Sequence, residues 1–281
     1  MDIEKDIKNL ADNYNNQPVV EFSGFTPNQM YQIVHFPFSA DCPIKLNHDI
    51  QLSQIQSSPI FNISYSLLEK ISESGKIKLT ARGNLPGKTL RAIYDERLFL
   101  DPMIENGITK LTTETDWIIL HTIHIILKLS GLARKNYGYL LLTKKGKKYF
   151  FEGNESSLFM NLLETYSMKY NWEYNDAYEI ESIGQVGFLY LLFLINKLGS
   201  KYEDMTLYSD HYFRAFPVFL ERYISDDSFR RRIPNNALSV RFFERFSYWF
   251  GFIKYQGDVK STIVNENIKI KKTQLLKSLI I

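Results

Sequence analysis

Apolar and polar positions recur mainly with helical spacing, and this pattern predicts a mostly helical chain. In residues 157–170, leucines and tyrosines repeat near i, i+4, i+5, i+8 and i+12, as on an amphipathic helix. Residues 186–198 are apolar nearly all round, which predicts a buried central helix. Further helices are expected at 3–14, at 27–35 and at 208–223, the last bent or interrupted at Pro217.

Three segments, at 63–98, 116–150 and 238–281, share one order of elements: a helix, a glycine turn, a strand, and a threonine before a new helix. In the second and third, a polar turn joins two strands into a hairpin. Gly131 and Gly251 fit the left-handed residue just past a helix end. We expect Thr80, Thr143 and Thr273 to cap the helices that follow them. This order is the layout of a winged helix, although the first segment has no clear hairpin partner.

The fold class predicted from these elements is mostly α (α+β): a helical protein with two or three winged-helix-like modules around a helical middle region. The expected divisions are an N-terminal helical and irregular segment at 1–60, tandem winged-helix-like modules at 61–150, an acidic helical region at 151–226, and a C-terminal winged-helix-like module at 227–281.

Four short motifs follow one another in the chain: Phe25-Thr26-Pro27-Asn28-Gln29-Met30, Lys78-Leu79-Thr80-Ala81-Arg82-Gly83-Asn84-Leu85-Pro86, Leu142-Thr143-Lys144-Lys145-Gly146 and Tyr170-Asn171-Trp172. This series resembles that of a group of uncharacterised bacterial proteins, over about residues 22–225. The second and third segments also resemble the winged-helix superfamily. The resemblance to the group implies no activity and no site residues.

Cysteine content and the apolar runs point to an intracellular protein. Cys42 is the single cysteine, so the chain can form neither an intrachain disulfide nor a thiolate metal site. The charged N-terminus is unlike a secretory signal. The longest apolar stretch, Val186 to Ile195, is about half of the ~20 residues that a membrane span needs. We therefore expect a cytoplasmic protein without membrane contact.

Positive charge is concentrated in two segments, although the net charge of the chain is only +3. Residues 128–150 hold seven basic and no acidic residues, and residues 227–281 hold eleven basic and four acidic ones. These segments could bind phosphates, or they could be solvated surface. The candidate nucleic-acid-binding residues are Lys144, Lys145, Lys147, Lys148, Arg230, Arg231, Arg232, Lys254, Lys271 and Lys272.

The segment from Gly83 to Thr89 ends in Gly-Lys-Thr and resembles a phosphate-binding loop that is one residue too short. A shorter ring cannot aim the same backbone N–H groups at a phosphate, and Pro86 lacks one of them. We therefore expect a turn into a helix, no cofactor and no enzymatic activity.

His121 and His124 lie three residues apart on one helix face, as a pair of metal ligands would. No Asp, Glu or Cys is close enough in sequence to complete a site, so we expect no metal and interpret the two histidines as polar positions of a buried helix.

The helix before the second hairpin, residues 117–128, has almost no polar face. Exposing its large apolar side chains would cost roughly 1.5–3 kcal/mol each. It therefore cannot lie in a DNA groove, where a recognition helix needs polar side chains at base edges. Only the third segment, with Arg241, Glu244 and Arg245, offers a mixed face.

Two hypotheses of function follow. The first is a non-enzymatic binding or scaffold protein that uses winged-helix-like modules for contact with an unknown protein partner. The alternative is a nucleic-acid-binding, transcription-regulator-like protein that acts through the basic C-terminal module and the wing. The sequence leaves the oligomeric state open.

Overall fold

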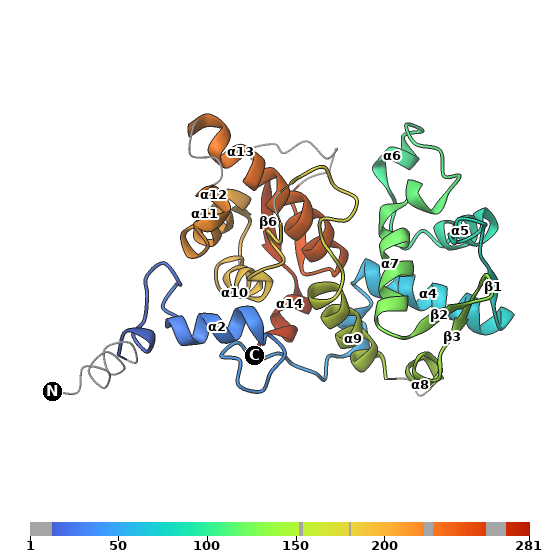
Figure 1. Ribbon diagram of the computed structural model, residues 1–281, viewed down its shortest axis with the longest axis horizontal. Coiled ribbons are helices and arrows are strands. Elements are labelled where there is room, and N and C mark those ends of the chain that lie inside the picture. The colour runs from blue at the N-terminus through green and yellow to red at the C-terminus, as the bar shows by residue number, and fades with distance from the viewer. Residues whose placement is uncertain (1–12, 152–153, 180, 222–226, 257–267) are drawn as a thin grey trace.

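The chain forms a mostly helical α+β structure with small antiparallel sheets. The computed structural model describes residues 13–151, 154–179, 181–221, 227–256 and 268–281, without the side chains of 227–231. Figure 1 shows two lobes side by side, with helix α9 (Glu155–Met168) between them. No helix in these ranges is long and apolar enough to span a membrane.

The first lobe, on the right of Figure 1, is built from residues 59–151. Its strands form one antiparallel sheet in the order β1-β3-β2, in which Ile77 pairs with Leu140 and Arg134 with Leu141. The strand of the segment at 63–98 therefore joins the hairpin of the segment at 116–150. In chain order, the elements are α4 (Pro59–Ser74), β1 (Ile77–Lys78), α5 (Gly87–Tyr94), α6 (Pro102–Glu105), the 3₁₀ helix η1 (Glu114–Asp116), α7 (Ile118–Leu129), β2 (Ala133–Asn136), β3 (Tyr139–Leu142) and α8 (Lys144–Phe151).

The second lobe contains a matching sheet in the order β4-β6-β5. Here the C-terminal hairpin pairs with a strand from the acidic region, since Glu203 lies opposite Ile270. The hairpin turn expected at Gly257-Asp258 lies outside the described residues, as does most of the helix expected at 3–14. The elements are α2 (Pro27–His35), α10 (Phe188–Leu198), β4 (Glu203–Asp204), α11 (Met205–Ala215), α12 (Val218–Glu221), α13 (Asp227–Leu238), the π-helix η2 (Ser239–Ser247), β5 (Ile253–Tyr255), β6 (Lys269–Lys272) and α14 (Gln274–Leu279). The short helix α3 (Leu52–Ile55) links the lobes.

Both glycine turns and two of the three threonine caps follow the expected local chemistry. Gly131 and Gly251 adopt φ of +73° and +74°, past the ends of α7 and η2. The hydroxyl of Thr143 accepts the N–H of Gly146, and that of Thr273 accepts the N–H of Leu276. The prediction for Thr80 was wrong: its hydroxyl accepts the N–H of Asn84 inside a loop, and α5 begins later, after Pro86.

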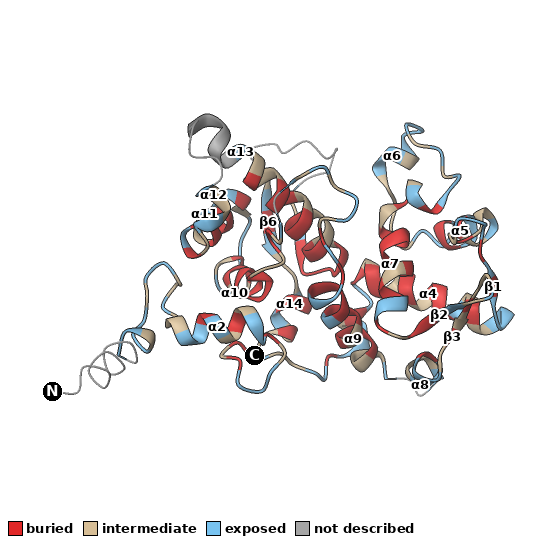
Figure 2. Ribbon diagram, in the orientation of Figure 1, coloured by how far each residue is buried: buried red, intermediate tan, exposed pale blue. Residues whose placement is uncertain are grey.

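Helix α7 is the centre of the first lobe. Most of its side chains are buried, including Ile119, Ile123 and Leu127, and it packs against α4 and α9 (Figure 2). It lies in the interior because its surface is apolar on nearly every side. The exposed parts of the lobe include the hairpin tip and the lysines of α8.

Candidate nucleic-acid interface

A buried carboxylate fixes the loop that leads from β1 into α5. Glu114 is fully buried, and one of its oxygens accepts the backbone N–H of Leu85. The Nδ1 atoms of His121 and His124 lie 2.7 and 2.9 Å from its other oxygen. Because an ionised carboxylate can only accept, both imidazoles donate to it. The cluster thus ties the loop to α7.

Burial by itself raises the pKa of Glu114, but hydrogen bonds from His121 and His124 and the N–H of Leu85 outweigh it and lower the pKa to about 2. Glu114 is the polar partner of His121 and His124, and it was not identified from the sequence. Within the described ranges, no cluster of His, Cys, Asp and Glu has a geometry that could hold a metal ion.

The same contact removes Leu85 from any phosphate-binding role. Its N–H points inward at Glu114, and the residue after it, Pro86, has no N–H to offer. The segment from Gly83 to Thr89 therefore turns the chain into α5 with its backbone donors partly directed at the protein interior.

The outer face of the β1-β3-β2 sheet carries basic side chains. Ile77, Leu140 and Leu142 are buried on the inner face, so the alternating positions point outward. We call the basic sheet face the set Lys76, Lys78, Arg134 and Tyr139. Lys78 lies opposite Tyr139, and the Nζ of Lys76 lies 4.4 Å from the centre of the Tyr139 ring. None of the three strands contains an acidic residue.

The tip of the β2–β3 hairpin projects an aromatic ring into solvent. Tyr137 is 95% exposed with φ of +45°, and Gly138 follows with φ of +77°. Two successive residues at positive φ make the tight turn whose twist matches the flanking strands. An exposed tyrosine of this kind can stack on a base while cations contact phosphates.

The lysines expected near this wing occupy α8, on the lower right of Figure 1. All four are exposed: Lys144, Lys145, Lys147 and Lys148. Lys145 is already engaged, because its Nζ donates at 2.8 Å to the carbonyl of Ser130 at the end of α7. It stabilises the helix end.

The basic residues expected in the C-terminal segment lie in the second lobe. Lys254 and Lys271 are exposed and face each other across β5 and β6. Lys272 caps α10: its Nζ donates to the backbone carbonyl of Asn196, and burial lowers its pKa. Arg232 is exposed on α13, whereas the side chains of Arg230 and Arg231 lie outside the description. Figure 1 places α8 in the first lobe, at the lower right, and α13 in the second lobe, at the upper left.

Both arginines of the mixed face expected for the third segment are engaged within the protein. Arg241 is fully buried, and its Nε lies 2.7 Å from the carboxylate of Asp176. Arg245 donates at 2.8 Å to the carbonyl of Asn175. Both guanidinium groups hold the loop before α10 against η2.

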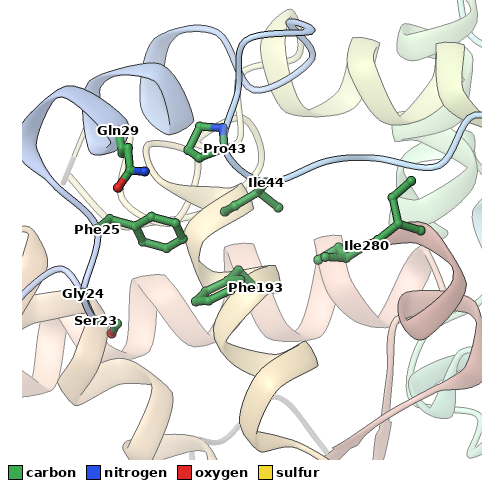
Figure 3. Close-up of a pocket in the computed structure, with 9 residues that line it drawn as sticks. Ser23, Gly24, Phe25, Gln29, Pro43, Ile44, Phe193 and Ile280 are labelled. Atoms are coloured by element: carbon green, nitrogen blue, oxygen red, sulfur yellow. The ribbon is translucent and has the colours of Figure 1, made fainter. Parts of the chain in front are cut away.

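A small pocket of about 330 Å³ lies near the C-terminus, between Phe25, Ile44 and Phe193 (Figure 3). Ser23, at its edge, has φ of +57°, and its hydroxyl lies 3.5 Å from His211 Nδ1. A nucleophilic serine would need free backbone donors for an oxyanion. The N–H groups of Ser23 and Gly24 instead donate to Val20 and Val19. These two N–H groups are therefore not free to bind an oxyanion.

Comparison with known proteins adds one finding. Residues 56–156 match the family model of the Y4jL N-terminal domain. The matched stretch runs from just before α4 to the start of α9, and so contains the whole first lobe. This agrees with the expected resemblance to an uncharacterised group at the level of that lobe. No curated protein and no solved structure matches the chain.

Proposed function

We propose that the chain is a non-enzymatic nucleic-acid-binding protein with a winged-helix-like module in each lobe, and that the basic sheet face and wing of the first lobe contact the phosphate backbone. The order of elements in each lobe supports the module assignment: a helix, a short strand, further helices, then a hairpin whose second strand is central in the sheet. A winged helix has this arrangement.

One observation carries the binding proposal. Lys78 and Arg134 lie on one face of the sheet, opposite Tyr139 and Leu141 of β3, and Lys76, just before β1, lies over the Tyr139 ring. None of the three strands contains an acidic residue. Lys78 and Arg134 belong to the two outer strands, and each is paired with an uncharged residue of the central strand. Such a positive surface favours an anionic partner, because each phosphate contacted neutralises a lysine or arginine and releases counterions.

The burial of α7 and η2, the helices before the two hairpins, limits the mode of binding. Because α7 and η2 are largely buried, neither can enter a major groove. Contacts from a sheet face and a wing reach phosphates and sugars, which carry no direct sequence information. The binding we propose is thus strongly dependent on salt and weakly dependent on sequence.

The proposal can be tested by fluorescence anisotropy. The affinity for labelled DNA and RNA of mixed sequence would be measured between about 50 and about 200 mM salt. We expect the triple variant Lys76→Ala, Lys78→Ala, Arg134→Ala to weaken binding and to reduce the slope of log affinity against log salt by about 2 to 3. The charge-matched control replaces Lys169, Lys201 and Lys277, exposed residues away from the sheet, and should retain binding.

A third variant tests which of the two lobes binds the nucleic acid. It replaces Lys254, Lys269 and Lys271 of the second sheet by Ala. If this variant loses binding and the Lys76, Lys78, Arg134 variant does not, the first lobe is not the interface. Absence of binding by the unaltered protein at low salt would refute nucleic-acid binding altogether, and would leave the protein-scaffold hypothesis.

A further inference from the structure

A groove of about 700 Å³ runs along the free edge of β1, beside the basic sheet face. It lies between the end of α4, the strand β1 and the start of α5, at the right of Figure 1. Lys76 and Lys78 belong to both surfaces, because they line the groove and also flank Tyr139 on the sheet. A strand held on the sheet face would therefore pass the mouth of the groove.

The groove combines cations with an apolar surface. Lys76, Lys78 and Lys88 are exposed along it, whereas Lys70 is held by Glu96 at 2.6 Å. One carboxylate, that of Glu73, lies among them. Pro86 and Ala92 supply apolar surface, and the mostly buried side chains of Ile77 and Leu79 border the groove from below. Its volume lies within the ~300–1,000 Å³ that is typical of small-ligand pockets.

A ligand that fits this chemistry has a flat apolar body and negative charges beside it, as a nucleotide does. We propose that the groove holds one unpaired nucleotide of the bound strand, so that the protein prefers single-stranded to double-stranded nucleic acid. This inference rests on the proposed function. Bases in a duplex are stacked and paired, and one of them can enter a side groove only after it is extruded from the stack.

Hydrogen bonds to the protein interior fix one wall of the groove. Thr80 and Pro86 line it, and they stand at the two ends of a loop that is closed by a hydrogen bond from the N–H of Asn84 to the Thr80 hydroxyl. Glu114 holds the Leu85 N–H of that loop from the interior. A preformed wall avoids the free-energy cost of ordering a loop when the ligand binds.

Filling the groove without changing its charge tests the inference. Ala92 is exposed on α5 and lines the groove, so Ala92→Phe occupies the space and leaves every lysine in place. Ala40→Phe, at an exposed turn of the second lobe, is the matched control. Anisotropy would compare a short labelled thymidine single strand with a DNA duplex of equal length.

We expect Ala92→Phe to weaken single-strand binding by about tenfold or more, and to leave duplex binding and the Ala40→Phe control unchanged. Equal affinity of Ala92→Phe and the unaltered protein for the single strand, or equal loss for single strand and duplex, would overturn the inference while the proposed function stands. Absence of binding to either nucleic acid would overturn both.

Crosslinking of the unaltered protein keeps the inference testable if thermal melting shows that Ala92→Phe does not fold. A single strand containing 5-iodouracil would be irradiated with the full chain and the crosslinked peptide mapped. Crosslinks within residues 76–92 support the groove as the nucleotide site. Crosslinks confined to other parts of the chain contradict it.

Discussion

Glu114 retains a negative charge in a fully buried position because three donors converge on it. A buried carboxylate without partners would be costly, and it would take up a proton instead. Here burial raises the pKa, but the hydrogen bonds from the two imidazoles and the Leu85 N–H outweigh this effect, and the pKa is lowered to about 2. The residue joins the interior of the first lobe to the loop that borders the groove.

This pKa fixes how acid affects stability. The pKa of Glu114 in the folded chain is about 2, below its ordinary value of 4.5, so the folded chain binds this proton more weakly than the unfolded chain does. Its contribution to the free energy of unfolding is complete above pH 4.5 and is lost as the pH falls toward 2.

We expect Glu114→Gln to lower the free energy of unfolding at neutral pH by about 2–3 kcal/mol, because the two imidazole donors lose their charged acceptor. The difference from the unaltered protein should shrink as the pH falls from 4.5 toward 2. Urea unfolding at a series of pH values measures it. Glu164→Gln, at an exposed position of α9, is the control. A difference that does not change across this pH window would refute the assignment.

Sequence reasoning identified His121 and His124 as one helix face but not their partner. Glu114 precedes α7 in a separate 3₁₀ turn, so helical spacing alone did not connect it with them. The structure places the candidate residues Lys144 and Lys147 on the exposed surface of α8. Lys76, Lys78 and Arg134 were missed as a site, because only the pairing of strands far apart in sequence brings them onto one face.

Among the elements, α7 is the one whose environment its residues determine most directly. An apolar surface on nearly every side leaves no solvent-facing option, so burial could be predicted before any fold was known. The hairpin from Ala133 to Leu142 could also be predicted from local sequence, because its turn at Tyr137-Gly138 and its two strands are adjacent in the chain. The partner of β1 was not local: Ile77 pairs with Leu140, and no neighbouring pattern indicates that pairing.

Two leucines near the end of α7 offer a matched test of this burial. Leu127 is fully buried, and Leu129 is 44% exposed. We expect Leu127→Ala to lower the free energy of unfolding by about 2–5 kcal/mol, since it leaves a cavity in the packed interior. Leu129→Ala should cost well under about 1 kcal/mol. Chemical denaturation of both variants checks this, and similar losses at the two sites would contradict the packing of α7.

Over the whole molecule, the two lobes are joined through aromatic packing on α9. Phe159 contacts Phe61 of the first lobe and Phe250 and Phe252 near the hairpin of the second, with ring centres 6.4, 5.9 and 6.2 Å apart. The edge-on geometry of these pairs favours their attraction. Because one buried ring contributes to both lobes, their stabilities are linked.

We therefore expect one cooperative unfolding transition for the unaltered chain. Phe159→Ala should lower its midpoint, with a loss of about 3–5 kcal/mol, and should separate the transitions of the two lobes. Phe151→Ala, at a ring that is 66% exposed, is the control. Differential scanning calorimetry reports the number of transitions. Two well-separated transitions in the unaltered protein would show that the lobes unfold independently.

Hydrogen–deuterium exchange of the full chain, with and without a single-stranded oligonucleotide, locates the interface without any substitution. If the basic sheet face and the wing bind the backbone, the amides of residues 76–79 and 133–141 become protected when the strand is added, and those of 253–255 and 269–272 do not. Protection confined to the second sheet, or no protection anywhere at low salt, would contradict an interface on the first lobe.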